Sequence, residues 1–366
     1  MAPDMSAHGK HLMLKLGDIA IDFPVVQAAL SGYSDWAMRV VARRLGAPYT
    51  LCEVLLDQFL NTVHKGRKAD RHLRVSDEEH PVGGQLMGAQ PDDFAPAARR
   101  LVEVGFDVVD INFGCPVKKV LGRCRGGFLL SQVDTALEIV AKVRGAVPER
   151  VPVTVKMRRG IDDSQQSRDN FFRIFDGAFE RGVAAITVHG RTVEQRYVGP
   201  SRWEFLREVK AHAGSRTVLG SGDLFTAQAC LDMIEQTSVD GVTAARGAIG
   251  NPWIFSQARS LAAGLPLPEP PRLHEQRHVL QQHFALAEEL YGPGLCGRQM
   301  RKFGIKYAQL HPQSREVRDA FVAVSRPDEW QTVLDRWYAE DLPGVHPGAD
   351  EPLELECVTP GGTASG

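Results

Sequence analysis

The run Val153-Thr154-Val155-Lys156-Met157 shows the pattern that decides the fold, because it is short, rich in β-branched residues and closed by polar side chains. Runs of this kind are typical of strands buried in a parallel sheet. Seven similar runs occur along the first two-thirds of the chain, and patterns typical of helices fill most of the gaps between them. The eight predicted strands cover residues 25–29, 49–53, 82–87, 108–112, 153–157, 185–189, 217–220 and 241–244.

Strands that alternate with helices predict an α/β fold, and eight strands are the number that closes a (β/α)₈ TIM barrel. A doubly wound open sheet is the competing topology. No Gly-x-Gly-x-x-Gly motif follows the first strand, which argues against a dinucleotide-binding Rossmann unit there. Two short apolar runs separated by Gly17-Asp18 predict a hairpin over about residues 12–23, which would close the bottom of the barrel.

A proline-rich stretch divides the chain. Residues 265–272 hold four prolines and are predicted to form a stiff linker. Helical patterns without strands follow it, so we expect a barrel domain over residues 1–264 and a small all-α domain over residues 273–340. The composition of residues 341–366, rich in Pro, Gly, Asp and Glu, predicts a disordered tail.

Composition excludes several classes of protein. The 43 Lys+Arg and 45 Asp+Glu give a formal charge of −2, which excludes a globally basic nucleic-acid coat but not a local basic patch. No apolar run approaches the ~20 residues of a membrane span, and the first ten residues lack a signal peptide. The six cysteines form no Cys-x-x-Cys pair. We therefore expect a cytoplasmic protein without a metal site.

Polar residues follow most of the predicted strands. Because the carboxyl ends of barrel strands meet at one rim, we expect these side chains to converge on a shared site. They are Gln85, Asn112, Lys156, His189, Ser221-Gly222-Asp223 and Arg246.

Cys115 follows the fourth predicted strand in Asn112-Phe113-Gly114-Cys115-Pro116. A thiol on the rim can act as a nucleophile or a proton donor, whereas most lone cysteines are buried small hydrophobes. Its place among the strand ends favours the first interpretation.

Lys156 and His189 point to an anionic ligand at the same rim. A lysine that ends a buried strand needs an anion or water, so a reduced flavin, a phosphate or a surface salt bridge would each satisfy Lys156. His189, followed by Gly190, is either a donor to a ring oxygen or a satisfied core histidine. The loops with Ser221-Gly222-Asp223 and Ala245-Arg246-Gly247 end the last two strands, where barrels commonly bind phosphate.

Basic residues gather locally at 65–74, 118–125 and 298–318. Arg298, Lys302 and Lys306 are spaced by four and therefore line one face of a predicted helix. Such a face is either simply solvated or a contact for a phosphate backbone.

The stretch Asp110-Ile111-Asn112-Phe113-Gly114-Cys115-Pro116-Val117-Lys118-Lys119-Val120 resembles the signature of the tRNA-dihydrouridine synthases, most like the bacterial B type. The similarity spans about residues 14–340. Further matches follow in the same order: Gln85-Leu86, Lys156-Met157-Arg158, His189-Gly190-Arg191-Thr192, Gly222-Asp223 and Asn251-Pro252-Trp253-Ile254-Phe255.

The resemblance implies an FMN-bound barrel, a helical tRNA-binding domain and reduction of the C5–C6 double bond of uridines, with NADPH or NADH as electron donor. Cys115 would protonate C5 while flavin N5 delivers hydride to C6. We expect a monomer. The implied flavin contacts, of which Asn112 could instead touch the uracil, are Ala29, Leu30, Ser31, Gln85, Asn112, Lys156, His189, Ser221, Gly222, Asp223, Ala245 and Arg246. The implied uridine and tRNA contacts are Lys118, Lys119, Arg123, Arg158, Arg191, Arg298, Arg301, Lys302 and Lys306.

Three departures from the family pattern fall at flavin contacts that the resemblance implies. Ala29-Leu30-Ser31 stands where Pro-Met-Ala is usual, Ser221 replaces an asparagine and Ala245 replaces a glycine. The hypothesis is that FMN still binds, with lower affinity. Two alternatives are an FMN barrel oxidoreductase acting on a small pyrimidine or enone, and a non-catalytic tRNA-binding relative.

Overall fold

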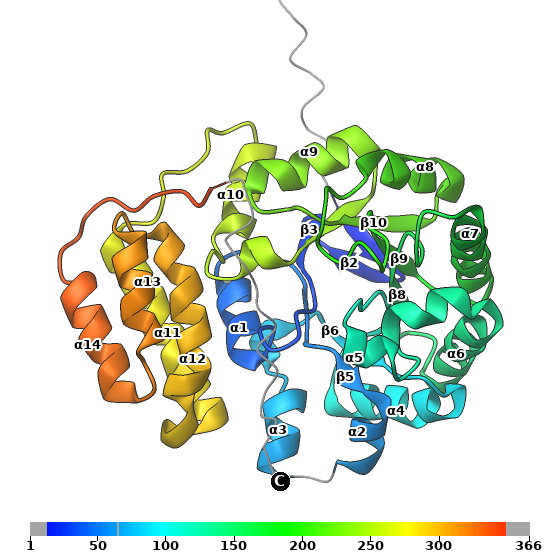
Figure 1. Cartoon of the computed structure of the whole chain (residues 1–366), viewed down its shortest axis with the longest axis horizontal. Helices are drawn as coiled ribbons and strands as arrows, with labels where there is room; N and C mark the ends of the chain where they lie inside the picture. The colour runs from blue at the N-terminus through cyan, green and yellow to red at the C-terminus, as the bar shows by residue number, and fades with distance from the viewer. Residues whose placement is uncertain (1–12, 64–65, 349–366) are drawn as a thin grey trace, which may run out of the picture.

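The computed structural model describes residues 13–63 and 66–348. Its larger part is a closed barrel of eight parallel strands, in the order β3-β4-β6-β7-β8-β9-β10-β11 and back to β3 (Figure 1). The fold class is confirmed, and each predicted run overlaps one barrel strand, with β7, β8 and β10 one residue longer than predicted. The strands are β3 (Val25–Gln27), β4 (Thr50–Leu51), β6 (Val82–Met87), β7 (Val108–Phe113), β8 (Val153–Arg158), β9 (Ala185–His189), β10 (Thr217–Ser221) and β11 (Gly241–Ala244).

Alternation along each strand separates the core from the site. In β8, Val153, Val155 and Met157 are fully buried in the layer between strands and helices. The intervening Thr154 and Lys156 therefore face the barrel interior. A further short strand, β5 (Leu55–Leu56), pairs with the end of β6 and was not predicted, because two residues carry no periodicity.

An antiparallel hairpin closes the amino-terminal end of the barrel. It consists of β1 (Leu14–Leu16) and β2 (Ile19–Ile21), with Gly17 in the left-handed region at φ 59° in the turn. The hairpin's leucines and Ile21 pack with Tyr49, Val108 and other side chains of the barrel interior. The opposite rim, at the carboxyl ends of the strands, is left for a ligand.

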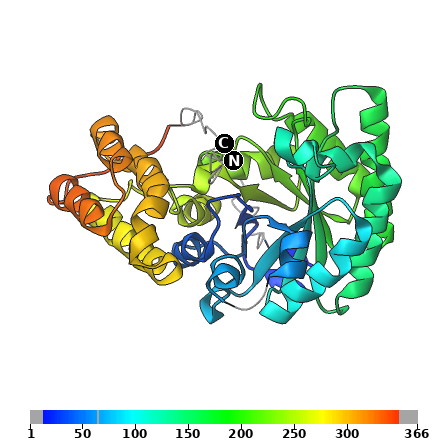
Figure 2. The same cartoon turned by 60° about the horizontal axis from the view of Figure 1, so that its bottom comes forward.

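Helices surround the barrel and a second group forms a bundle beside it (Figures 1 and 2). The barrel helices and the short helices of its loops are α1 (Trp36–Arg44), α2 (Asp57–Thr62), α3 (Arg67–Leu73), α4 (Pro91–Val104), α5 (Lys118–Leu121), α6 (Val133–Ala146), α7 (Gln165–Glu180), α8 (Trp203–Ala213), α9 (Ala227–Thr237) and α10 (Ile254–Ala262). The bundle contains α11 (Leu273–Tyr291), α12 (Pro293–Tyr307), α13 (Ser314–Val322) and α14 (Pro327–Trp337).

The bundle packs against the α1 side of the barrel, where α11 lies along α1. Trp253 Nε1 donates to Glu275 Oε1 at 2.6 Å across this boundary. Gly250 has φ 73°, and a Cβ there would lie 2.3 Å from the carbonyl carbon of Lys306, so the two parts approach each other closely. Residues 265–272 contain no helix or strand. Bundle contacts continue past residue 340, since Val345 N–H donates to the Leu310 carbonyl at 2.9 Å; residues 349–366 of the predicted tail lie outside the described residues.

Candidate active site

Asn112, on β7, holds the Cys115 loop. Its Oδ1 accepts hydrogen bonds from the backbone N–H groups of Gly114 at 2.9 Å and Cys115 at 3.0 Å. Its Nδ2 donates to Gln85 Oε1, on the neighbouring strand β6, at 2.8 Å. The thiol-bearing loop is therefore fixed to two strand ends, and each of the two amides keeps one N–H for another partner.

A buried carboxylate anchors this pair of amides. Asp110 is 2% exposed and accepts hydrogen bonds from Gln85 Nε2 at 2.7 Å and Thr154 Oγ1 at 2.5 Å. Burial raises the pKa of Asp110, while Thr154, Gln85 and the nearby Lys156 lower it. Sequence reasoning quoted Asp110 only as part of a motif, although its position two residues before Asn112 places both on the inner face of β7.

Two glycines allow the far end of the loop to fold back onto Cys115. Gly127 N–H donates to the Cys115 carbonyl at 3.1 Å. Gly126 has φ 59°, and a Cβ there would lie 2.8 Å from the Cys115 Cβ. Arg125 Nη2 then donates to Gln58 Oε1 of α2 at 2.8 Å. Cys115 itself is partly exposed at the rim.

Arg158, at the end of β8, binds backbone carbonyls on both sides of the rim. Its guanidinium donates to the carbonyls of Gly114 at 2.9 Å, Thr192 at 2.8 Å and Arg196 at 2.7 Å. Burial lowers the pKa of Arg158 to about 10. It was predicted as a tRNA contact, but at 3% exposure it is buried and tied to the Cys115 loop.

Lys156 points into the barrel one position before this rim. Burial, followed by the charge of Arg158, lowers the pKa of Lys156 to about 8, and Asp110 opposes the shift. Among residues 13–63 and 66–348, no carboxylate lies within ion-pair distance of its ammonium group. The predicted need of Lys156 for an anion is therefore unmet by the described protein groups.

His189 is a neutral donor at the end of β9. Arg191 Nη1 lies 3.4 Å from His189 Nε2, and because a guanidinium only donates, Nε2 accepts and Nδ1 carries the proton. The pKa of His189 is well below its usual range because the ring is buried and because Arg158, Lys156, Arg191 and Arg246 surround it.

Asp223, in the loop after β10, lies beside two arginines of the same carboxyl-end rim. It has φ 59°, forms an ion pair with the buried Arg191 at 2.8 Å and lies 3.6 Å from Arg246. Burial lowers the pKa of Arg246. Tyr197, which sequence reasoning missed, is 49% exposed at the mouth, with its ring centroid 4.8 Å from the Arg246 guanidinium carbon and 5.7 Å from that of Arg158.

The other predicted residues fall into three groups. In the barrel mouth, Ser221 is buried, Gly222 has φ 113°, and Ala245 precedes the turn Arg246–Ala248. Ala29, Leu30 and Ser31 lie in the loop between β3 and α1. The remaining cations divide by exposure: Lys118, Lys119, Arg123, Arg298 and Arg301 are exposed, whereas Lys302 and Lys306 are partly buried. The predicted basic face of α12 therefore has two exposed arginines, Arg298 and Arg301, and two partly buried lysines, Lys302 and Lys306.

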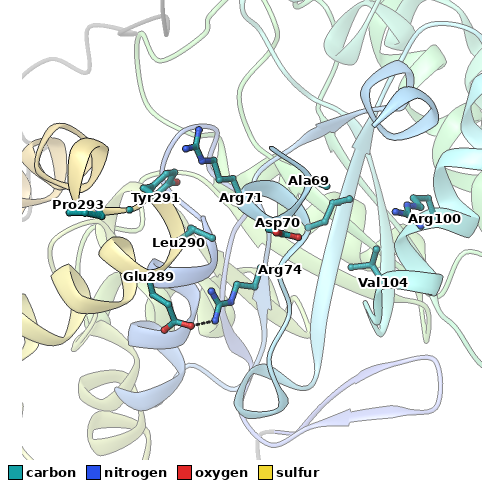
Figure 3. A pocket seen from close by; sticks show the side chains of 12 residues that line it. Ala69, Asp70, Arg71, Arg74, Arg100, Val104, Glu289, Leu290, Tyr291 and Pro293 are labelled. Carbon is teal, nitrogen blue, oxygen red and sulfur yellow. Dashed lines mark hydrogen bonds and ion pairs between the residues drawn. The ribbon is translucent and has the colours of Figure 1, made fainter. Parts of the chain in front are cut away.

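A cavity of about 680 Å³ lies between α3, α4 and the junction of α11 with α12, and none of its described lining residues belongs to a barrel strand (Figure 3). Arg71, Arg74 and Tyr291 line it, and Arg74 forms an ion pair with Glu289. Part of the 65–74 basic cluster is therefore neutralised within the chain. In the described part of the chain, no cluster of three His, Cys, Asp or Glu residues could hold a metal ion. None of the described helices is long and apolar enough to cross a membrane.

The fold and the convergent polar groups define a (β/α)₈-barrel enzyme with its site at the carboxyl ends of the strands. Two solved structures share this fold. Histamine dehydrogenase from Rhizobium sp. 4-9 matches with a TM-score of 0.56 and 14% identity over 75% of this chain and 50% of its own. Morphinone reductase in complex with tetrahydroNAD matches with a TM-score of 0.52 and 14% identity over 71% and 92%.

Sequence comparison is more specific. Residues 26–341 match the family profile "Dihydrouridine synthase (Dus)". A probable tRNA-dihydrouridine synthase of Mycobacterium tuberculosis is 34% identical, covering 88% of this chain and 84% of the relative. The tRNA-dihydrouridine synthase B of Xanthomonas campestris is 35% identical over 91% and 98%. The chain belongs to the dihydrouridine synthase family, as the motifs around Cys115 predicted.

Proposed function

We propose that this protein is an FMN-dependent tRNA-dihydrouridine synthase, which reduces the C5–C6 double bond of particular uridines in tRNA with NADPH as the source of electrons. One observation carries the proposal: the Cys115 loop is fixed by Asn112 beside a barrel mouth crowded with cations. A proton donor and an anion site at the same rim are what hydride addition to a uracil requires.

The residues of the mouth fit an anionic flavin. Lys156 has no carboxylate partner among the described residues, and Asp223 lies 2.8 Å from Arg191 and 3.6 Å from Arg246 at the same mouth. Lys156 and the neutral His189 would bind the ring system, while Arg246 and the backbone near Ser221 would bind the phosphate. When bound, FMN would supply the hydride that adds to C6 of the uracil.

Cys115 would carry the proton that goes to C5. The thiol can donate a proton to a carbon only if the sulfur is held at a fixed place relative to the base. Asn112 at the start of the loop, Arg158 at the Gly114 carbonyl and Gly126 at the far end supply that fixation. These three are positioning groups for the thiol.

RNA would approach over the exposed cations next to this loop. Lys118, Lys119 and Arg123 are exposed beside Cys115, and Arg298 and Arg301 are exposed on α12. Neutralising phosphates with such side chains supplies affinity that does not depend on sequence. The target uridine must leave the tRNA stack to reach the barrel rim. A monomeric state and a cytoplasmic location stay predictions.

Two cysteine variants test the proposal. The purified wild-type protein should show a flavin absorbance band and form dihydrouridine in tRNA when NADPH is added. Cys115→Ala should keep the flavin band and lose dihydrouridine formation by about 100-fold or more. Cys124→Ala changes an exposed thiol of the same loop and should behave as the wild type. A colourless protein that FMN cannot reconstitute, or wild-type turnover by Cys115→Ala, would contradict the proposal.

A further inference from the structure

The loop between β3 and α1, residues 28–35, is held at its tip from two directions. Gly32 occupies the tip with φ 75°. Its N–H donates to Glu53 Oε2, at the end of β4, at 2.8 Å. Its carbonyl accepts a hydrogen bond from Lys302 Nζ, which comes from α12 of the helical bundle. A rim loop of the barrel is therefore fastened to the bundle by a lysine 270 residues away in sequence.

Neighbouring contacts strengthen this attachment. The Tyr33 ring packs edge-on against Phe303 of α12 with centroids 5.4 Å apart, and Lys302 Nζ lies 5.3 Å from the Tyr33 centroid. The Tyr291 hydroxyl of α11 donates to Asp35 Oδ2 at 2.8 Å. Asp35 in turn caps α1. The loop and the first turn of α1 thus contact two helices of the bundle.

Charge keeps Lys302 in this place. Burial lowers the pKa of Lys302, while the carboxylates of Asp35 and Glu53 raise it. The Lys302 ammonium group therefore lies between the Gly32 carbonyl and the carboxylates of Asp35 and Glu53. Arg298, one turn earlier on the same helix, is exposed. The sequence had placed both on one basic face for tRNA, and the structure gives Lys302 a different neighbourhood.

Movement of Gly32 would be passed to the part of the loop that directly follows the carboxyl end of β3. The Leu30 carbonyl accepts hydrogen bonds from Tyr33 N–H and Ser34 N–H, both at 2.9 Å, and Leu30 N–H donates to Ser34 Oγ at 2.8 Å. The segment from Leu30 to Ser34 is therefore one hydrogen-bonded unit. Leu30 belongs to the three residues at which this chain departs from the family's usual Pro-Met-Ala.

We propose that Lys302 is a positioning residue for the flavin: it holds Gly32 so that the segment 29–31 keeps its place against the cofactor, and the helical bundle thereby sets flavin affinity. The inference rests on the proposed function, because the flavin contact of this segment is expected from the family. A bundle that holds a barrel loop would compensate for the departure at residues 29–31.

Two methionine variants of the full chain separate this role from RNA binding. FMN dissociation constants are measured by flavin fluorescence, and tRNA dissociation constants by fluorescence anisotropy. Lys302→Met should weaken FMN binding about tenfold, the effect of losing one charged hydrogen bond, and leave tRNA affinity within about twofold. Arg298→Met should do the reverse. Lys302→Arg, which keeps the charge and a donor, should restore most of the FMN affinity.

Lys302→Met with wild-type FMN affinity overturns the inference, as does a loss confined to tRNA binding. If Lys302→Met does not fold, Tyr291→Phe tests the same attachment by removing one hydroxyl, and unchanged FMN affinity in that variant has the same meaning. A wild-type protein that binds no FMN contradicts the proposed function itself. If the wild type, Lys302→Met and Tyr291→Phe all bind FMN with the same affinity, the role of the bundle is overturned and the proposed function is not.

Discussion

Replacing Asn112 by alanine removes the side chain that fixes the catalytic loop. Three hydrogen bonds disappear, from Gly114 N–H, Cys115 N–H and to Gln85. At about 1 kcal/mol each they total about 3 kcal/mol. Because the loop is partly exposed and water can replace some partners, we expect a loss of about 2 kcal/mol in the free energy of unfolding, measured by urea denaturation.

The effect on turnover should be larger than the effect on stability suggests. A thiol displaced by about 1 Å can cost about 100-fold in rate. The assay is single-turnover reoxidation of the reduced, FMN-saturated enzyme by tRNA, so that any change in flavin affinity does not enter. Asn61→Ala is the matched control, because Asn61 is exposed and makes one hydrogen bond, to the Asp93 carbonyl at 2.9 Å. Wild-type stability and a wild-type single-turnover rate in Asn112→Ala would show that Asn112 does not fix the loop.

Three further predictions follow from the mouth of the barrel. In the wild type, FMN affinity should fall as the pH rises through about 8, where Lys156 loses its charge, and Lys156→Met should lose this dependence between about pH 7 and 9 in a fluorescence titration. The folded pKa of His189 lies below its unfolded value of about 6.5, so the native state binds fewer protons and the free energy of unfolding drops as the pH falls below about 6.5. In urea denaturation, His189→Gln should therefore lose less of its free energy of unfolding than the wild type between about pH 7 and 5. An equal loss in the two proteins would count against a buried neutral His189 ring. Gly247→Ala would place a Cβ 2.1 Å from the Leu224 carbonyl oxygen, so this variant should have both a lower melting temperature and a lower FMN affinity. Gly145→Ala is the control, because nothing lies within 4 Å of a Cβ there. It should leave FMN affinity unchanged and leave the melting temperature unchanged or slightly raised.

The barrel was predictable because its signals are local. Each strand is an apolar run whose inner-facing residues are read from alternation, and the strand ends must meet at one rim once the barrel closes. Asn112 and Gln85 are hydrogen-bonded there at 2.8 Å, and Lys156 lies near enough to His189 for its charge to lower the pKa of that ring. The sequence motif also led to the correct family.

The partners of the charged residues were not predictable, because they depend on distant backbone. Arg158 and Arg191 were expected to meet RNA, but the carbonyls of the loop after β9 and Asp223 occupy them. Lys302 shares its helical spacing with Arg298, yet its contact is Gly32, which no periodicity reveals. The role of Asp110 was not predicted, because it depends on hydrogen bonds from Gln85 and Thr154, which lie on two neighbouring strands.

Cys115 and the cation-lined barrel mouth are proposed to reduce uridines in tRNA. The most direct test is to map dihydrouridine by sequencing in tRNA from cells that lack this gene and carry either the wild-type chain or Cys115→Ala. We expect that specific dihydrouridines vanish without the gene, return with the wild type and stay absent with Cys115→Ala. An unchanged dihydrouridine map after deletion, or full restoration by Cys115→Ala, would contradict it.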